Sequence, residues 1–167
     1  MRLTTEGLGS LRIGQPVTAS GMVEYDPDFC DAESGNPDDP ANGRWLSVYG
    51  DDTFGVAVTE AGVLGSIGVR QADIRTPGGI GVGSTVDELR AAHPDAVVSP
   101  PSNDVALTDV WVLRGATGQL VFEVANDSQP GYFPPEELGT VVTLRSSSLG
   151  VGEQSRWGTD LTEGGCL

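Results

Sequence analysis

The stretch "TPGGIGVGSTVDELRAAHP", residues 76–94, sets the fold expected of this chain. Thr85 and Glu88 have the Thr-x-x-Glu spacing of a capping box, in which both side chains bond to backbone amides at a helix start. Apolar residues then recur at helical spacing around Leu89, and Pro94 cannot continue the helix. The stretch therefore predicts a glycine-rich turn that leads into a short capped helix.

The glycines at 79, 81 and 83 raise the question of a phosphate-binding loop. A P-loop needs a lysine to neutralise the phosphates, and the sequence contains none. The dinucleotide fingerprint is a strand followed by Gly-x-Gly-x-x-Gly, whereas the spacing here is Gly-x-Gly-x-Gly directly after Pro77 and Gly78. We expect the glycines to serve backbone turns and predict no nucleotide or other cofactor.

The same pattern occurs earlier in the chain. "LTTEGLGSLRIGQPV" (Leu3 to Val17) matches "IRTPGGIGVGSTV" (Ile74 to Val86), with Gly14 aligned to Gly83. Each half then carries an expected hairpin and a third strand-like run: Arg44 to Glu60 and Val63 to Ile74 in the first half, Asp109 to Val124 and Glu137 to Ser146 in the second. The order of elements predicts an internal duplication.

The expected fold class is α+β, with two tandem repeats of one helix and an antiparallel meander. The units are residues 1–73 and 74–149, followed by a tail at 150–167, and together they form one compact domain. One helix on a three-stranded sheet is a marginal core, so we expect the units to share one sheet with both helices on one face. Pro16 and Gly21 predict a shorter helix in the first copy.

The charge is strongly acidic: 24 acidic residues against 9 basic ones give a formal net charge of −15. Such a field repels nucleic acid and anionic lipid, so we predict no nucleic-acid binding and expect a charged protein partner to be basic. The absence of lysine is typical of a high-GC genome and suggests an actinobacterial source, although halophilic adaptation explains the acidity equally well. No apolar run approaches the roughly 20 residues of a membrane span.

Cys30 and Cys166 are the only cysteines, and neither lies in a Cys-x-x-Cys pair. One interpretation is a disulfide, which predicts an extracellular or cell-envelope location; the other is two unrelated thiols. "MRLTTEGLGS" lacks the apolar core of a signal peptide. If the protein is exported, a signal peptide or lipid anchor is absent from this sequence.

Catalytic patterns are weak. His93 is the only histidine and precedes a proline at a helix end, and no Gly-x-Ser-x-Gly motif accompanies it. We therefore predict no catalytic residues, with a small enzyme of unrecognised class as the alternative.

The acidic loop that starts at Asp26 offers oxygen ligands for calcium, the first being Asp26, Asp28, Asp31 and Glu33. Their spacing matches no EF-hand, and prolines interrupt the loop. A calcium-binding module is the alternative function, and a solvated acidic loop is the competing interpretation.

Aromatic residues mark the candidate binding surface. Strand alternation places Trp45 and Tyr49 on one face, and Trp111 occupies a similar strand in the second half. Tyr132 and Phe133 lie in a later loop. If exposed, these rings suit protein recognition; the alternative is that they pack beneath loops or the helix. We predict a non-catalytic protein that binds another macromolecule through this sheet face or its loops.

The segments "VGSTVDEL" (Val82 to Leu89) and "IGQPV" (Ile13 to Val17) resemble the helix starts of the tandem-repeat fold of beta-lactamase inhibitory protein and of the BamE-type outer-membrane assembly lipoproteins. The tail "TEGGCL" is similar to that of exported actinobacterial proteins of unknown function. The resemblance implies the two-unit fold. The inhibitor has a disulfide within each unit and this chain does not, so no functional residue is carried over.

Overall fold

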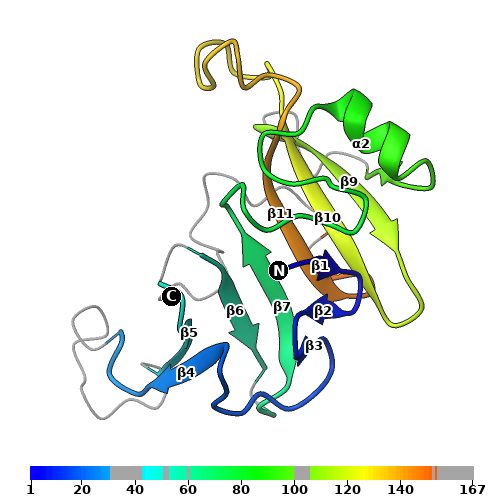
Figure 1. Ribbon diagram of the computed structural model, residues 1–167. Helices are drawn as coiled ribbons and strands as arrows, with labels where there is room; N and C mark the ends of the chain where they lie inside the picture. The colour runs from blue at the N-terminus through cyan, green and yellow to red at the C-terminus, as the bar shows by residue number, and fades with distance from the viewer. Residues whose placement is uncertain (31–42, 51–52, 60, 100–105, 152, 154–167) are drawn as a thin grey trace.

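The computed structural model describes residues 1–30, 43–50, 53–59, 61–99, 106–151 and 153. Its largest element is a six-stranded antiparallel sheet with the strand order β6-β7-β11-β10-β9-β8 (Figure 1). The strands are β6 (Gly55–Val58), β7 (Leu64–Val69), β8 (Val97–Val98), β9 (Thr108–Arg114), β10 (Gly118–Ala125) and β11 (Val141–Ser148).

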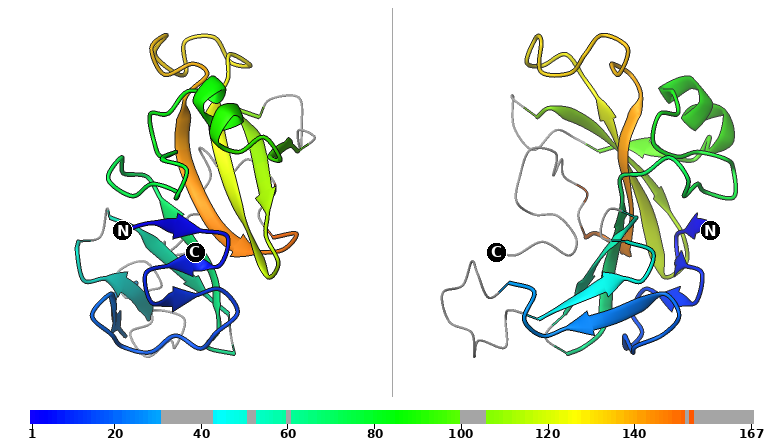
Figure 2. Two further views of the ribbon diagram at one scale, coloured as in Figure 1. Left: turned by 45° about the vertical axis from the view of Figure 1, so that its right-hand side comes forward. Right: turned by 60° about the vertical axis from the view of Figure 1, so that its left-hand side comes forward.

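Three smaller elements accompany the large sheet. Strands β1 (Leu3–Thr4), β2 (Gly7–Leu8) and β3 (Leu11–Arg12) form a short meander, and β4 (Val23–Asp26) pairs with β5 (Arg44–Ser47) in a two-stranded ribbon. The helix α2 spans Val86–Ala92. The meander and α2 lie on the same side of the six-stranded sheet, while the ribbon lies beyond the β6 edge (Figures 1 and 2).

Alternation along β10 divides the large sheet into two faces. Leu120 and Phe122 point toward the meander and α2, where they meet Leu8 and Leu89 in the main apolar core. All four side chains are at most 2% exposed. Burial of this apolar face supplies the main driving force for docking α2 and the meander on the sheet.

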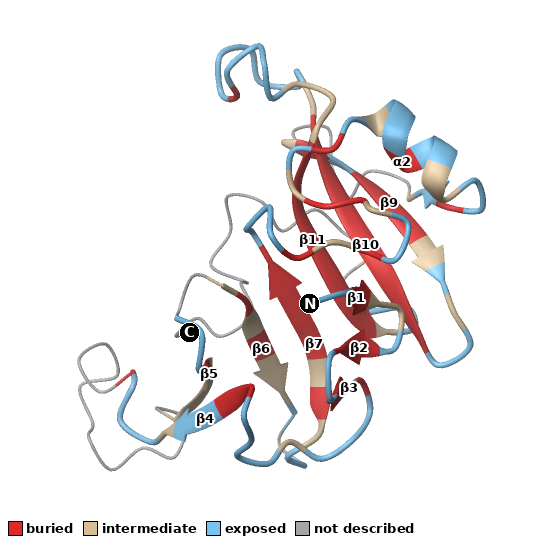
Figure 3. Cartoon of the chain, in the orientation of Figure 1, coloured by how far each residue is buried: buried red, intermediate tan, exposed pale blue. Residues whose placement is uncertain are grey.

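The opposite face of β10 and β11 is also buried, although it is polar. Gln119 donates to the carbonyl oxygen of Val151 at 2.9 Å, and the Ser147 hydroxyl donates to the same oxygen at 2.8 Å. The chain therefore turns back after β11 and places Val151 against this face at the β11 end. Figure 3 shows that β10 and β11 are buried along their lengths, in contrast to most of β4.

The predictions for the second half are confirmed. Thr85 caps α2, its side chain accepting from the Glu88 amide while Glu88 accepts from the Thr85 amide. The predicted hairpin is β9–β10, and the predicted third strand is β11. Gly118 in the hairpin is required by a close approach, because a Cβ there would lie 2.2 Å from the Thr5 carbonyl oxygen.

The predicted fold class is wrong. The protein is mostly β, with three antiparallel sheets and α2 as the one helix in the described part of the chain, so it is not an α+β repeat with a helix in each unit. Gly14 and Gly83 both have positive φ, at 79° and 85°, so the glycine turn does recur. In the first copy Pro16 and Ala19 stand where the second copy has Thr85 and Glu88, so the side chains of the capping box are missing there.

Backbone hydrogen bonds show what the first copy forms instead of a helix. The amide of Leu64 donates to the Gln15 carbonyl at 2.9 Å, and the amide of Val17 donates to the Gly62 carbonyl at 3.0 Å. The segment thus runs in an extended conformation beside the start of β7. These partners satisfy backbone groups that a helix would have bonded internally.

The hairpin predicted over 44–60 is also wrong. The turn is present, with the Thr53 amide donating to the Gly50 carbonyl at 3.0 Å, but β5 pairs with β4 and β6 pairs with β7. The turn therefore joins two different sheets. In addition, β7 from the first predicted unit pairs with β11 from the second.

Candidate binding surface

The β4–β5 ribbon carries a cross-strand aromatic pair. Tyr25 lies opposite Trp45 in the register, and their ring centroids are 5.3 Å apart at an interplanar angle of 51°. At the inner end of the ribbon, Val23 and Ser47 lie on the same face as the two rings, and both are buried. Along this face, burial therefore decreases from Val23 and Ser47 to the two rings.

Exposure is uneven among the rings near this end of the molecule. Tyr25 is 49% exposed, whereas Trp45 is half-buried and packs against the main core. Phe29 and Tyr49 are exposed as well, Tyr49 lying just beyond the inner end of β5. We call the side chains of Tyr25 and Trp45 the ribbon surface. Phe29 and Tyr49 follow β4 and β5 in the sequence and are not part of it.

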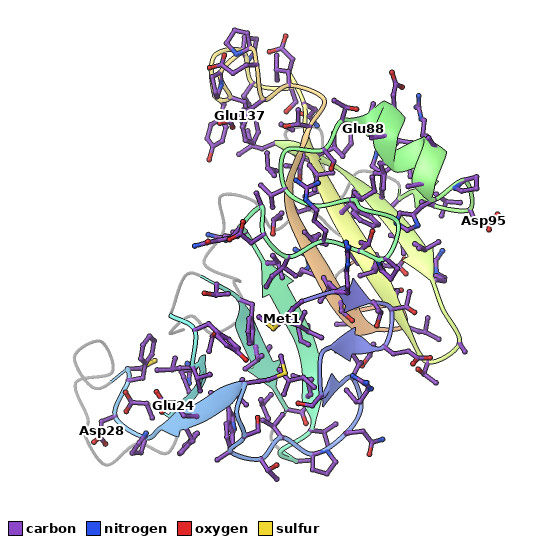
Figure 4. The ribbon with its side chains drawn as sticks, viewed as in Figure 1. Met1, Glu24, Asp28, Glu88, Asp95 and Glu137 are labelled. Carbon is purple, nitrogen blue, oxygen red and sulfur yellow. The ribbon has the colours of Figure 1, made fainter. Side chains whose placement is uncertain are left out.

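Acidic residues accompany the ribbon surface. Glu24 and Asp28 are exposed, and Figure 4 places both at the β4 end of the molecule. Strand alternation directs Glu24 and Asp26 to the face opposite Tyr25. Arg44 lies opposite Asp26 in the register. It is the one basic residue of the two strands, which also carry the acidic residues Glu24 and Asp26.

The other predicted aromatic residues do not join the ribbon surface. Trp111 is 8% exposed in the core, and the Arg90 guanidinium of α2 lies 5.0 Å from its ring centroid. Tyr132 is 48% exposed on the loop between β10 and β11, at the far end of the molecule. Phe133 is buried against Ala125 and Val142, so it anchors the loop while Tyr132 stays accessible.

The glycine-rich loop has its amides engaged within the protein. The amides of Ile80 and Gly81 donate to the hydroxyls of Thr76 and Ser84, and that of Gly83 donates to Val141. A phosphate would have to displace these bonds, which agrees with a structural role for the loop. A polar cavity of about 550 Å³ lies between the loop and α2.

His93 closes α2 against the same loop. Its Nε2 lies 3.0 Å from the Thr76 hydroxyl, and its ring centroid lies 5.7 Å from that of Phe122. Burial lowers the pKa of His93 below its ordinary value of 6.5. Through these two contacts His93 joins the end of α2 to the glycine-rich loop and to the apolar face of the large sheet.

The predicted calcium ligands and cysteine pair are only partly within the described residues. Asp26 accepts from the Asp28 amide at 3.0 Å, while Asp31 and Glu33 lie outside the described residues. The described part of the chain contains no cluster of metal-ligating side chains. Cys30 is buried, and Cys166 lies outside the described residues, so both the calcium site and the disulfide stay predictions.

A buried ion pair that sequence analysis missed lies on the polar face of the large sheet. Glu123 accepts from the Arg145 guanidinium at 2.5 Å and from the Thr108 hydroxyl at 2.6 Å. Glu123 and Arg145 are at most 2% exposed. The signal was present in "LVFEVA" and "TLRSSS", where a single charge interrupts a strand that is otherwise uncharged.

The described residues include no helix with the length and apolarity needed to cross a membrane. Comparisons with protein-family models, with curated proteins and with solved structures find no match to this chain. They leave the resemblance to the two tandem-repeat families untested.

Proposed function

We propose that this protein is a non-catalytic binding protein that holds a basic segment of another protein on the ribbon surface. The observation that carries the proposal is the Tyr25–Trp45 pair on a two-stranded ribbon, in which the Tyr25 ring is exposed and Trp45 is half-buried. Large rings with exposed faces are enriched at protein interfaces, where Tyr and Trp supply most of the binding energy. An extracellular or cell-envelope location is part of the same proposal, together with the predicted Cys30–Cys166 disulfide.

Charge supports the choice of a basic partner. The formal net charge is −15, and Glu24, Asp26 and Asp28 lie on or next to β4. Acidic groups on the opposite face of the ribbon and next to β4 attract a cationic segment over a long range, which raises the association rate. Near-neutral or acidic partners gain nothing from this field.

The test is an amide chemical-shift titration of the labelled protein with a random copolymer of lysine and arginine at physiological ionic strength. We expect the largest shifts at Val23–Asp26 and Arg44–Ser47. Removing the exposed ring by Tyr25→Ala should weaken binding by about fivefold to thirtyfold, the range of an ordinary interface side chain.

Tyr132→Ala is the matched control, because Tyr132 is as exposed as Tyr25 but belongs to the far loop. It should leave the affinity unchanged. Shifts spread over all acidic surfaces, with equal affinity for the two variants, would show attraction by net charge alone and would contradict the proposal.

A further inference from the structure

We propose that the open edge of β4 receives an extended segment of the partner in which arginine, rather than lysine, stacks on Tyr25. This inference rests on the proposed function and names the partner's chemistry and its placement. The bound segment would lie beside β4 as an added strand.

The register identifies which backbone groups of β4 point outward. The Val48 amide donates to the Met22 carbonyl at 3.1 Å, which makes these two residues a hydrogen-bonded pair of the ribbon. In an antiparallel pair such bonds occur at every second residue, so Glu24 and Asp26 also bond to β5. Consequently the amide and carbonyl of Tyr25 point away from β5.

The outer edge of β4 is open in the described part of the chain, since the ribbon has two strands and β4 is paired only with β5. Toward the start of β4 the edge is occupied, because the Val23 carbonyl accepts from the Ser20 amide at 2.9 Å. Beyond Asp26 it ends at Pro27, which has no N–H. The free position is therefore centred on Tyr25, with one donor and one acceptor for an added strand.

A strand at this position meets different groups on the two faces of the ribbon. One face presents the Tyr25 and Trp45 rings, and the other presents the carboxylates of Glu24 and Asp26. An alternating segment can thus place an arginine on the rings and a second basic residue toward the carboxylates. The guanidinium is planar and weakly hydrated, so it stacks on an aromatic face better than an ammonium group.

The main core of the same chain contains this type of contact. The Arg90 guanidinium carbon lies 5.0 Å from the Trp111 ring centroid, within the range for a cation–π interaction. The ribbon surface offers a comparable ring without a covering cation: no cation–ring contact to Tyr25 or Trp45 is present among the described residues.

The test compares three short capped peptides by calorimetry with the intact protein. The first alternates arginine with threonine, the second replaces each arginine by lysine, and the third is the arginine peptide with alternate backbone amides methylated. We expect the arginine peptide to bind about threefold to tenfold more tightly than the lysine peptide. Methylation should weaken the binding of the arginine peptide by a similar factor, because the added strand loses its backbone hydrogen bond to Tyr25.

Two variants distinguish the contribution of stacking on the Tyr25 ring from that of backbone pairing at the β4 edge. Tyr25→Phe should keep the preference for arginine, and Tyr25→Leu should remove it while keeping the effect of methylation. Equal binding of the arginine and lysine peptides to the unsubstituted protein would overturn the stacking, and indifference to methylation would overturn the added strand. In either case a copolymer affinity that still depends on Tyr25 leaves the proposed function standing. If no peptide binds and the copolymer ignores Tyr25, both proposals fail.

Discussion

Trp45 and Trp111 stand in similar sequence surroundings, and the fold treats them differently. Trp45 lies on a two-stranded ribbon, where it is half-buried and packs against the main core. Trp111 lies on a strand of the six-stranded sheet, beneath Arg90 of α2, and is 8% exposed. Both strands alternate in the same way, so local pattern does not separate the two.

The difference shows that burial depends on what covers a strand. Strands β10 and β11 of the six-stranded sheet are buried on both faces: α2 and the β1–β3 meander pack on one side, and on the other the Val151 carbonyl accepts from Gln119 and Ser147. Among the described residues, the ribbon has no comparable cover beyond its inner end. A strand at the margin of a fold retains exposed rings, and such rings are available for binding.

The largest expected effect concerns the buried charges of the large sheet. Glu123→Gln leaves the Arg145 cation buried opposite a neutral group, so we expect the free energy of unfolding to fall by about 3–5 kcal/mol. The ribbon counterpart, Asp26→Asn, removes a charge opposite Arg44 at a half-buried site and should cost less than about 1 kcal/mol. Urea denaturation of both variants measures the contrast.

A double variant checks the cause of that loss. Glu123→Leu combined with Arg145→Met removes both charges and should recover much of the stability lost in Glu123→Gln, as found when apolar side chains replace buried ion pairs. If the double variant is less stable than the single one, the polar face needs the ion pair itself and our explanation of the loss is wrong.

The two tryptophans provide the next comparison. Trp111→Ala removes a nearly buried ring and its contact with Arg90, with an expected cost of about 3–5 kcal/mol. Trp45→Ala should cost about half as much or less, since part of that ring already faces solvent. Thermal unfolding of the two variants under identical conditions is the measurement. Equal losses would mean that the ribbon contributes to the core as fully as the sheet does.

The helix that only the second copy forms gives a smaller effect. Thr85→Ala removes the hydroxyl that caps α2 and should lower the free energy of unfolding by about 1 kcal/mol. Thr18→Ala, at an exposed position in the first copy, should change it by less than about 0.5 kcal/mol. A cost at Thr18 as large as that at Thr85 would indicate a cap in the first copy that the structure does not contain.

The smallest expected effect is the pH dependence contributed by His93. Because burial lowers the pKa of this histidine, the unfolded chain binds a proton at a higher pH than the folded protein does. The unfolded state is therefore favoured as the pH falls through 6.5 and down to the lowered pKa, and no further loss occurs below it. Across this pH window, urea titrations should show that the free energy of unfolding of His93→Gln depends less on pH than that of the unsubstituted protein.

Sequence reasoning succeeded where the signals were local. The spacing of Thr85 and Glu88 identified a cap, and the two apolar runs around Gly115 and Gly118 identified a hairpin. Each of these structures is stabilised by contacts between residues close together in the sequence. The projecting loop was likewise identified, although the burial of Phe133 beside an exposed Tyr132 was not.

The first half was predicted poorly because its pairing is set by distant residues. The segment after Arg44 contains two apolar runs and a turn, which suffices for a hairpin in sequence terms. In the structure the first run pairs with β4, and the second pairs with β7, which in turn pairs with β11. The choice among competing strand partners depends on the total apolar area buried, which no single segment contains.

By itself the sequence determined the acidic charge, the glycine turns at Gly14 and Gly83, the capped helix and the β9–β10 hairpin. Composition and short-range hydrogen bonding decide these features. Only the tertiary structure decided that Pro16 begins an extended segment, that Trp111 is buried while Tyr25 is exposed, and that Glu123 meets Arg145. Those outcomes depend on which apolar surfaces are buried against each other when the sheets and α2 pack, and these contacts are between residues far apart in the chain.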